Sequence, residues 1–325
     1  MKNNLLYKLC SGKNSKFIYF AKNYLNLLIP NFFFRIKLRS TLKHVALRSD
    51  WSYIESRVNY YNKLSSQVAL PNDANHLSEH RIKKQKVYFF DSYEFTRWFP
   101  SSYKWGICPG DVTFIPSFPS VVKSRPLTDD NQNSILMKLD KVRHFIFVKD
   151  KLSFEDKKNK AIFRGKVKGK PSRKLFMEMY FNHPMCDLGD VSKHTDDPKE
   201  WQSEKKTIRE HLDYKFILAL EGNDVASNLK WVMSSNSIAV MPKPTCETWF
   251  MEGTLIPNYH YIEIKPDFSD LEERLNYYIN HPEEALTIIA HAHDYVEKFK
   301  NKKREKLISL LVLDKYFKMT GQTID

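Results

Sequence analysis

The chain has 325 residues, of which 42% are hydrophobic and 14% aromatic, so it can bury a sizeable core in one large or two ordinary domains. This composition excludes wholesale disorder. The formal net charge of +14 indicates an anionic partner, such as a nucleic acid, a membrane surface or a phosphorylated substrate.

Residues 1–49 carry much of this charge, because they contain seven lysines, three arginines and no acidic residue. An apolar aromatic patch at residues 24–34 is shorter than the roughly 20 apolar residues that a membrane-spanning helix needs. It also lacks the small-residue cleavage site of a secretory signal. A basic segment with aromatic anchors suits the cytoplasmic face of an anionic membrane. An equally good interpretation is the first strand and helix of a domain that is merely basic.

Residues 51–80 have apolar positions three and four apart, which predicts a helix that ends in a polar loop at residues 71–73. Beyond this helix, short apolar or proline-punctuated segments predict strands and extended chain. These segments are residues 87–90, 111–116, 120–123 and 145–148. The lysine-rich stretch at residues 149–160 has no periodicity and indicates a domain boundary.

The second half of the chain alternates between strand and helix signals. An apolar run at residues 216–220 precedes a turn at Gly222, a periodic segment at residues 225–233 and a second apolar run at residues 237–241. This order is typical of a βαβ unit in a parallel sheet. Ligands bind outside the carboxyl ends of the strands in such sheets, and a helix that begins after the Gly222 turn offers free N–H groups to a phosphate. We therefore expect residues 214–264 to form the floor of a nucleotide site.

From Asp270 onward the pattern is helical, with a break at the basic run of residues 298–306. The predicted fold class is α/β, with two α/β domains that meet near residue 150 and a C-terminal helical segment that packs back on the first domain. The predicted divisions are a basic aromatic segment that forms part of the first domain (1–49), an acceptor-side α/β domain (50–150), a nucleotide-binding α/β domain (151–290) and C-terminal helices (291–325).

A basic cluster follows the apolar residues 161–163. Its glycines do not have the spacing of a Walker phosphate loop, and Pro171 follows the last lysine where that loop has Ser or Thr. Arg164 and Arg173, with the lysines between them, can still clamp a diphosphate by charge and bidentate contact. The alternative, a solvated basic loop, is the more common meaning of such a cluster.

The Gly222 turn also has two interpretations. It is either a tight turn in which glycine and asparagine supply unusual backbone angles, or a phosphate site to which Ser227 and Lys230 contribute. Asp111 likewise follows Pro109-Gly110 at a bend, where a carboxylate is usually a turn former or cap. The alternative role is a general base, because sugar transfer requires an acceptor hydroxyl to lose its proton as it attacks.

No metal site and no cofactor are expected. His291 and His293 are two residues apart in a predicted helix, so they face different sides. The four cysteines lie far apart without a C-x-x-C pair, which argues against zinc and against a disulfide framework and favours a reducing compartment.

Several motifs in this order resemble glycosyltransferase family 90, the family of capsule-associated proteins and eukaryotic protein O-glucosyltransferases. In the second half they are residues 162–165, 221–231, 248–250 and 260–265, together with Arg173 and Ser237. In the first half, residues 110–116 and 122–126 resemble the bacterial branch, which builds lipopolysaccharide cores. The resemblance covers roughly residues 88–297.

The resemblance implies a GT-B architecture of two Rossmann-like domains, with the acceptor domain first and the nucleotide-sugar domain second. It also implies metal-independent transfer from a UDP-sugar with inversion at the anomeric carbon. Asp111 matches the catalytic base of the family. The residues expected to bind the donor are Arg164, Gly165, Arg173, Gly222, Asn223, Asp224, Val225, Ala226, Ser227, Asn228, Lys230 and Glu252, and those expected at the acceptor side or cleft are Lys123, Ser124 and Arg125. Lys230 stands where eukaryotic members have Arg, so its contact lacks the bidentate fork.

We therefore expect a UDP-sugar-dependent hexosyltransferase that moves glucose or galactose to a lipopolysaccharide or lipooligosaccharide core. The expected location is cytoplasmic, peripheral to the inner face of the bacterial inner membrane, because the basic N-terminal segment suits an anionic membrane and a phosphorylated lipid-linked acceptor. One alternative is a transferase of the same family that builds a capsule or another surface glycan. The other is a basic nucleic-acid-binding protein, which is disfavoured because no known nucleic-acid module is visible.

Overall fold

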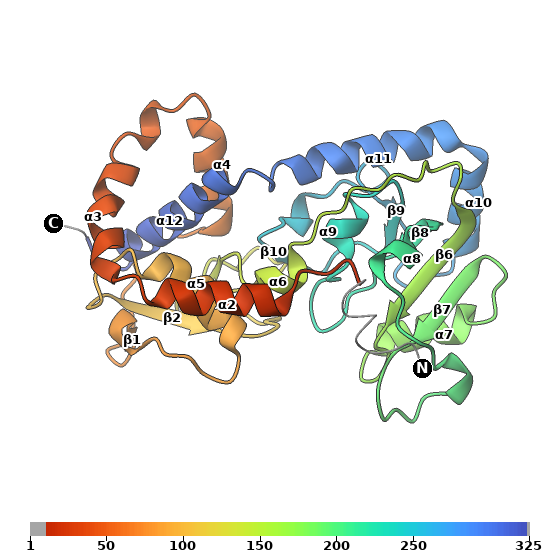
Figure 1. The fold of residues 1–325 in the computed structure, drawn as a ribbon, viewed down its shortest axis with the longest axis horizontal. Helices are drawn as coiled ribbons and strands as arrows, with labels where there is room; N and C mark the ends of the chain where they lie inside the picture. The colour runs from red at the N-terminus through yellow and green to blue at the C-terminus, as the bar shows by residue number, and fades with distance from the viewer. Residues whose placement is uncertain (1–10, 324–325) are drawn as a thin grey trace. The chain divides into compact units, whose positions relative to one another are not determined.

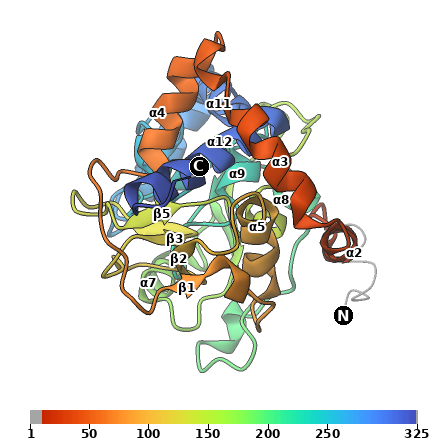
Figure 2. The same cartoon turned by 90° about the vertical axis from the view of Figure 1, so that its left-hand side faces the viewer.

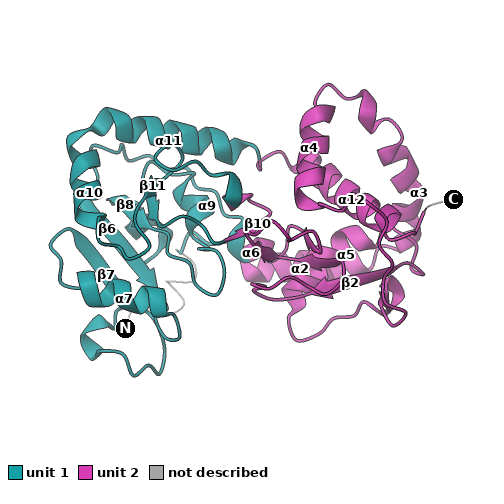
Figure 3. Cartoon of the chain, turned by 180° about the vertical axis from the view of Figure 1, so that it is seen from behind, with its two compact units in different colours: residues 1–14, 143–245, 253–298 teal, residues 15–142, 246–252, 299–325 magenta. Residues whose placement is uncertain are grey.

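The computed structural model describes residues 11–323, which form two compact units (Figure 3). Among these residues, unit 1 comprises 11–14, 143–245 and 253–298, and unit 2 comprises 15–142, 246–252 and 299–323. The predicted domains are continuous ranges, whereas each unit takes segments from several parts of the chain. The C-terminal helices divide between the units, because α11 (Pro282–Glu297) belongs to unit 1 and α12 (Lys302–Met319) to unit 2.

Unit 1 contains a five-stranded parallel sheet (Figure 1). Its strands, in the order in which they lie, are β11 (Ile262–Glu263), β9 (Ile238–Met241), β8 (Tyr214–Leu218), β6 (Lys158–Gly165) and β7 (Cys186–Asp190). The central strands β8 and β9 are continuous apolar runs with every residue buried, as expected for strands covered on both faces.

One face of this sheet carries the main core of unit 1. Alternate residues Ala161 and Phe163 of β6 join Phe216 and Leu218 of β8 in one apolar cluster. The helices that complete this cluster are α7 (Pro171–Tyr180), α10 (Leu271–Asn280) and α11. In α10 the buried residues Leu271, Leu275 and Tyr278 recur at spacings of four and three, which is the pattern of a helix with one apolar face.

The strand order places a topological switch point between β6 and β8. In chain order the five strands read 2-1-3-4-5, and the chain runs outward from β6 to β7 before it returns to β8 on the other side of β6. In open parallel sheets of this order, ligands bind outside the carboxyl ends of the strands that flank the switch point. Residues 166–173 and 219–224 follow these two carboxyl ends.

Unit 2 is built on a smaller, mixed sheet (Figure 2). Its strands, again in the order in which they lie, are β1 (Asn75–His76), β2 (Lys104–Cys108), β3 (Ser120–Val122) and β5 (Ser134–Leu136). A separate antiparallel pair joins β4 (Ser124–Pro126) to β10 (Cys246–Thr248). Tyr316 of α12 fixes that helix to the sheet, because its hydroxyl donates to the Pro119 carbonyl and accepts from the Gly106 N–H, both at 2.9 Å.

The helices of unit 2 are α2 (Lys16–Leu27), α3 (Asn31–Leu42), α4 (Trp51–Tyr61), α5 (Lys86–Thr96) and α12. The four-residue α6 (Lys141–His144) spans the boundary at which the chain passes from unit 2 to unit 1. The shorter α8 (Ile208–His211) and α9 (Leu229–Val232) belong to unit 1. Within unit 2, α12 packs on α4 and α5. No helix in residues 11–323 combines the length and apolarity needed to cross a membrane.

The predicted α/β class and the strands near residues 120, 161, 216 and 238 are confirmed. Two predicted strands are wrong: residues 87–90 lie in α5, and residues 145–148 form no regular element. The helix expected over residues 51–80 ends at Tyr61, because the Asn62 side chain accepts the Leu64 N–H at 3.1 Å and turns the chain. For the first 49 residues one interpretation was the first strand and helix of a basic domain, and residues 16–42 form two helices without a strand.

Candidate active site

Arg173 ties together the two loops at the switch point of unit 1. Its Nη1 donates to the Lys166 carbonyl at 2.9 Å, in the loop after β6. Its Nη2 and Nε donate to the carbonyls of Leu220 and Glu221 at 2.8 and 2.9 Å, in the loop after β8. Burial, followed by the charge of Arg143, lowers the pKa of this guanidinium to about 10. Three of its five N–H groups thus serve to hold backbone in place.

The Gly222 turn lies against this guanidinium. A Cβ on Gly222 would lie 3.0 Å from Nη2 of Arg173, so a residue larger than glycine would require either the turn or the Arg173 guanidinium to shift. The Gly222 N–H donates to the Asp224 carbonyl at 2.9 Å, and the Asn223 side chain accepts from Lys170. The predicted turn is therefore present and closely packed.

The helix expected directly after this turn is shorter than predicted. Only Leu229–Val232 form α9, and residues 224–228 are turns and bends. A single helical turn has few aligned peptide dipoles, so the predicted phosphate site on a helix N-terminus is not formed here. Asn228 instead holds the segment on the sheet, because its Nδ2 donates to the Leu218 carbonyl at 3.0 Å.

The other predicted donor residues of this segment differ in exposure. Val225, Ala226 and Asp224 are buried, while Ser227 is half-buried. Lys230 is fully buried, and its ammonium nitrogen lies 5.9 Å from the centre of the Phe145 ring.

Arg164 and Gly165 end β6, and Arg164 is held by Asp187 of β7. Its Nη1 donates to the Asp187 carbonyl at 2.8 Å, and its Nη2 binds the Asp187 carboxylate. Burial alone would raise the pKa of this carboxyl, but hydrogen bonds from Tyr214 and Arg164 and the charges of Arg164 and Lys206 lower it to about 2. Gly165 has no room for a side chain, because a Cβ would lie 2.4 Å from the Phe163 ring.

Asp187 was missed by the sequence reasoning. It lies directly across from Ile162 in the β6–β7 register, and Ile162 is two residues before Arg164 along β6. The signal that points to it is an acidic residue inside the apolar strand Cys186-Asp187-Leu188, because such a residue requires a cationic partner on the neighbouring strand.

Unit 2 contains Asp111, paired with Lys123. The Lys123 ammonium donates to the Asp111 carboxylate, and the two side chains are 2% and 18% exposed. This ion pair fixes the orientation of the Asp111 carboxylate. Ser124, next to Lys123, binds the chain beside Asp111, because its Oγ accepts the Val112 N–H at 3.1 Å and donates to the Val112 carbonyl at 3.0 Å.

Arg125 is fully buried in unit 2 and binds Glu247, another residue that the sequence reasoning missed. Its Nε donates to the Glu247 carboxylate at 2.8 Å, and its Nη2 donates to the Tyr60 carbonyl at 2.8 Å. Glu252 belongs to the same unit, and its carboxylate accepts the Thr248 N–H at 2.6 Å and the Thr248 hydroxyl at 2.9 Å. The structure thus places Glu252 with Asp111 in unit 2, and the other predicted donor residues in unit 1.

Each unit therefore offers one kind of chemistry. The switch-point loops of unit 1 present backbone held by Arg173 and the exposed or half-exposed Lys166, Lys168 and Lys170, which suits an anionic ligand. Unit 2 presents a partly exposed carboxylate with a buried cationic partner, which suits proton transfer. In residues 11–323 no group of three or more His, Cys, Asp and Glu side chains is arranged to hold a metal ion.

Comparison with known proteins adds two findings. A family model described as Glycosyl transferase family 90 matches residues 133–321. The chain is also 41% identical over 266 residues to the O-glucosyltransferase LpsA of Dichelobacter nodosus, which covers 82% of this chain and 83% of that protein. These matches include the switch point of unit 1, and the first of them also includes α12.

Proposed function

Since the chain belongs to glycosyltransferase family 90, we propose that it transfers a hexose, glucose or galactose, from a UDP-sugar to a lipopolysaccharide or lipooligosaccharide core. The observation that carries this proposal is the similarity, over most of both chains, to a protein named as an O-glucosyltransferase. The proposed architecture is GT-B, with unit 1 as the donor-binding domain. The parallel sheet and switch point of unit 1 support this assignment.

In this proposal the UDP diphosphate binds at the loops after β6 and β8. Arg173 and Gly222 set the shape of these loops, and Lys166 and Lys170 supply positive charge beside them. Arg164, held by Asp187, keeps the end of β6 in place. Preorganised cations and N–H groups stabilise the negative charge that develops on the departing UDP, so no metal ion is required.

Asp111 acts as the general base. Its carboxylate accepts the proton of the acceptor hydroxyl as the hydroxyl oxygen attacks the anomeric carbon, and the bond to UDP breaks on the opposite side of that carbon. A single displacement of this kind inverts the configuration. The buried Lys123 ammonium orients the Asp111 carboxylate toward the position of the acceptor hydroxyl.

Substitution of Asp111→Asn tests this role. The amide oxygen can still accept from Lys123, so the fold of unit 2 is kept, but the side chain can no longer take a proton. We expect the transfer rate to fall by roughly 10²–10⁴-fold, the usual contribution of a general base. Binding of UDP, measured by isothermal titration calorimetry, should stay within a factor of about two, or about 0.4 kcal/mol, because Asp111 is not part of the unit 1 loops that are proposed to bind the diphosphate.

The matched control is Asp129→Asn, an exposed aspartate in the same unit, which should leave the rate unchanged. Assays with UDP-glucose, UDP-galactose and UDP-N-acetylhexosamines, each with and without EDTA, identify the donor and the role of metal. Full activity of the Asp111 variant would remove Asp111 from the mechanism, and inhibition by EDTA that manganese reverses would contradict metal independence.

A further inference from the structure

The outward face of α2 in unit 2 is apolar, which is the reverse of an ordinary surface helix. Phe17, Ile18, Leu25 and Leu28, in the helix and at its C-terminal end, have exposed fractions of 65–82%. They recur at spacings that place them on one side of a helix. The chain thus exposes a stripe of large apolar side chains rather than scattered ones, and such stripes mark an interaction surface.

The opposite side of α2 is already packed on α5. The Tyr19 hydroxyl donates to the Asp91 carboxylate at 2.6 Å, and the rings of Phe20 and Tyr24 meet the edge of Phe90 at centroid distances of 6.0 and 4.9 Å. The inner side of the helix therefore has its own partners within unit 2. The apolar outer side of α2 is therefore not needed to hold the helix on α5.

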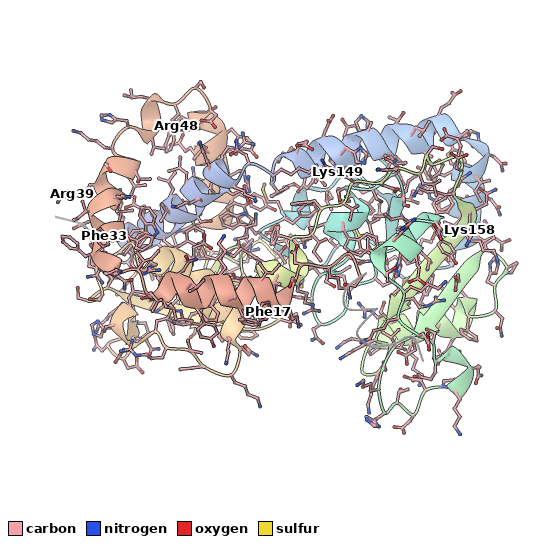
Figure 4. The ribbon with its side chains drawn as sticks, viewed as in Figure 1. Phe17, Phe33, Arg39, Arg48, Lys149 and Lys158 are labelled. Atoms are coloured by element: carbon pink, nitrogen blue, oxygen red, sulfur yellow. The ribbon has the colours of Figure 1, made fainter. Side chains whose placement is uncertain are left out.

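The next helix, α3, combines apolar and basic residues on its outward side. Phe32, Phe33 and Ile36 are 54–64% exposed, and Lys37 and Arg39 are exposed beside them. Figure 4 shows Phe17 on α2 and Phe33 and Arg39 on α3, each extending away from the ribbon. The inner side of α3 is packed, because Phe34 meets the Trp98 ring at 5.3 Å and Leu38 is buried.

Arg97 fixes the connection between the two helices. Its Nη1 donates to the Asn26 carbonyl at 2.8 Å and its Nη2 donates to the Ile29 carbonyl, both at the end of α2. Its Nε donates to the Asn31 side chain at 3.0 Å, and its guanidinium lies 4.1 Å from the centre of the Phe34 ring in α3. The apolar surface is therefore preformed rather than induced.

The charge around this surface has one sign. Residues 15–49 contain four lysines, three arginines and no acidic residue. The acidic side chains of α5 are engaged elsewhere, because Asp91 is buried and both Asp91 and Glu94 bind Lys141. Asp50, which follows this segment, is paired with Arg48. Positive charge beside exposed apolar side chains matches an anionic lipid surface.

We propose that the outward faces of α2 and α3 form a membrane-docking surface that lies in the interface of an anionic bilayer, with Phe17, Leu28 and Phe33 in the acyl boundary. A second copy of the chain is a poorer occupant, since a two-fold interface would place like charges opposite each other. A nucleic acid would gain little from aliphatic residues such as Ile18, Leu25 and Leu28. The proposal goes beyond the transferase function and does not depend on it.

Vesicle co-sedimentation of the full chain tests this surface. The purified protein is mixed with vesicles of phosphatidylcholine alone and with vesicles that also contain phosphatidylglycerol. We expect the wild type to bind the anionic vesicles at least roughly tenfold more strongly, because each basic side chain near an anionic surface contributes about fivefold. This preference should weaken as salt is added.

Two variants separate the apolar and the electrostatic contributions. The first replaces Phe17, Leu28 and Phe33 by Ser and should reduce binding to anionic vesicles roughly tenfold or more, since each loses its buried apolar area. The second replaces Lys37, Arg39 and Lys43 by Gln and should reduce binding selectively to the phosphatidylglycerol vesicles. All six side chains are exposed, so both variants should keep the wild-type melting temperature.

Matched controls change the same residue types elsewhere. They are Leu175, Ile256 and Leu286 replaced by Ser, and Lys149, Lys151 and Lys303 replaced by Gln, all of which are exposed. Retention of vesicle binding by both controls supports the proposal. Equal losses in controls and variants would overturn it, and so would a wild type that does not sediment with anionic vesicles. Loss of a dimer in the apolar variant without a change in vesicle binding would also overturn it, in favour of self-association.

Discussion

Arg173 could act through its charge or through its hydrogen bonds, and these two roles predict different effects of replacing it by lysine. The sequence pattern suggested a cation for a diphosphate, whereas the guanidinium binds three backbone carbonyls, those of Lys166, Leu220 and Glu221. A flexible lysine keeps the charge but cannot reach three carbonyls that are held by a planar fork. The hydrogen bonds therefore indicate a residue that shapes the loops after β6 and β8 and does not only supply positive charge beside them.

We expect Arg173→Lys and Arg173→Met to weaken UDP binding by similar factors, roughly tenfold, because both lose the connection between the two loops. Both should also lower the free energy of unfolding by about 2 kcal/mol, since the part-buried Leu220 and Glu221 carbonyls each cost about 1 kcal/mol when left without a partner, while the exposed Lys166 carbonyl can bond to water. Calorimetric titration with UDP and unfolding in urea measure the two effects. Lys174→Met, an exposed neighbour, is the control.

If the lysine variant binds UDP as tightly as the wild type while the methionine variant does not, the contribution of Arg173 is charge alone. The shaping role would then be wrong, even though the hydrogen bonds exist.

The sequence identified Asp111 and Lys123 as separate candidates but could not show that they pair. Twelve positions separate them, and no helix or hairpin spacing relates them; the pairing depends on the position of Lys123 at the end of β3. The same holds for Arg164 and Asp187, which meet through the register of β6 and β7. Such ion pairs form only in the tertiary structure, so a local sequence pattern does not predict them.

At the scale of elements, Glu305 connects α12 to three other parts of unit 2. Its carboxylate accepts from Arg57 of α4 at 2.5 Å and from the Trp249 indole N–H at 2.7 Å. Lys138 donates to it as well, at 3.1 Å. The Trp249 ring stacks on Tyr61 of α4 at a centroid distance of 3.8 Å. A buried charge cluster thus joins four segments that are far apart in the chain, those of Arg57, Lys138, Trp249 and Glu305.

Glu305→Gln should lower the free energy of unfolding by about 3 kcal/mol, because removal of one member of a buried ion pair leaves the other charge uncompensated. Urea unfolding followed by tryptophan fluorescence measures the change. Glu283→Gln, at an exposed position in α11, should change the stability by less than about 0.5 kcal/mol. A loss as small as this for Glu305→Gln would show that the cluster contributes little net stability.

Element prediction succeeded where apolar runs were continuous and failed where they were short. The runs of β8 and β9 are buried on both faces and are followed by glycine or proline, so their continuous apolar character identified them. The run at Val87-Tyr88-Phe89-Phe90 is equally apolar, but it lies in α5, which buries residues on several sides of the helix. A short apolar run is compatible with either a buried strand or a buried helix. The two are told apart by the length of the element and by the residues that it packs against, and a run of four residues shows neither.

At the scale of the whole chain, the sequence identified the parallel sheet of unit 1 but not the composition of unit 2. Unit 1 is formed largely by consecutive βα elements, so local sequence patterns mark most of its strands and helices. Unit 2 also contains residues 246–252 and 299–323, which follow segments of unit 1 along the chain. β10 pairs with β4 through only three residues, and no local signal marks a partner that is more than a hundred positions away.

Both units contain a histidine that burial keeps neutral, and this makes the stability of the whole chain depend on pH. Burial is the main cause that lowers the pKa of His211 in unit 1 to about 4, against a hydrogen bond to the Thr207 carbonyl. Burial likewise lowers the pKa of His80 in unit 2 to about 4. His260 of unit 1, which accepts the Ile256 N–H at 2.9 Å, behaves in the same way.

Between pH 6.5 and pH 4 the unfolded chain binds protons at these histidines that the folded chain does not bind, so stability falls as the pH falls. A difference of about 2.5 pKa units corresponds to about 3 kcal/mol for each fully buried group. We expect the free energy of unfolding to be highest above pH 6.5 and to fall by at least about 3 kcal/mol by pH 4.

Urea unfolding across this pH range, for the wild type and for His211→Gln, measures how steeply the free energy of unfolding depends on pH. The variant should show a shallower slope, whereas His44→Gln, at an exposed position, should retain the wild-type slope. A wild-type stability that stays constant from pH 6.5 to pH 4 would mean that these histidines become charged without unfolding, and that their burial is not maintained in solution.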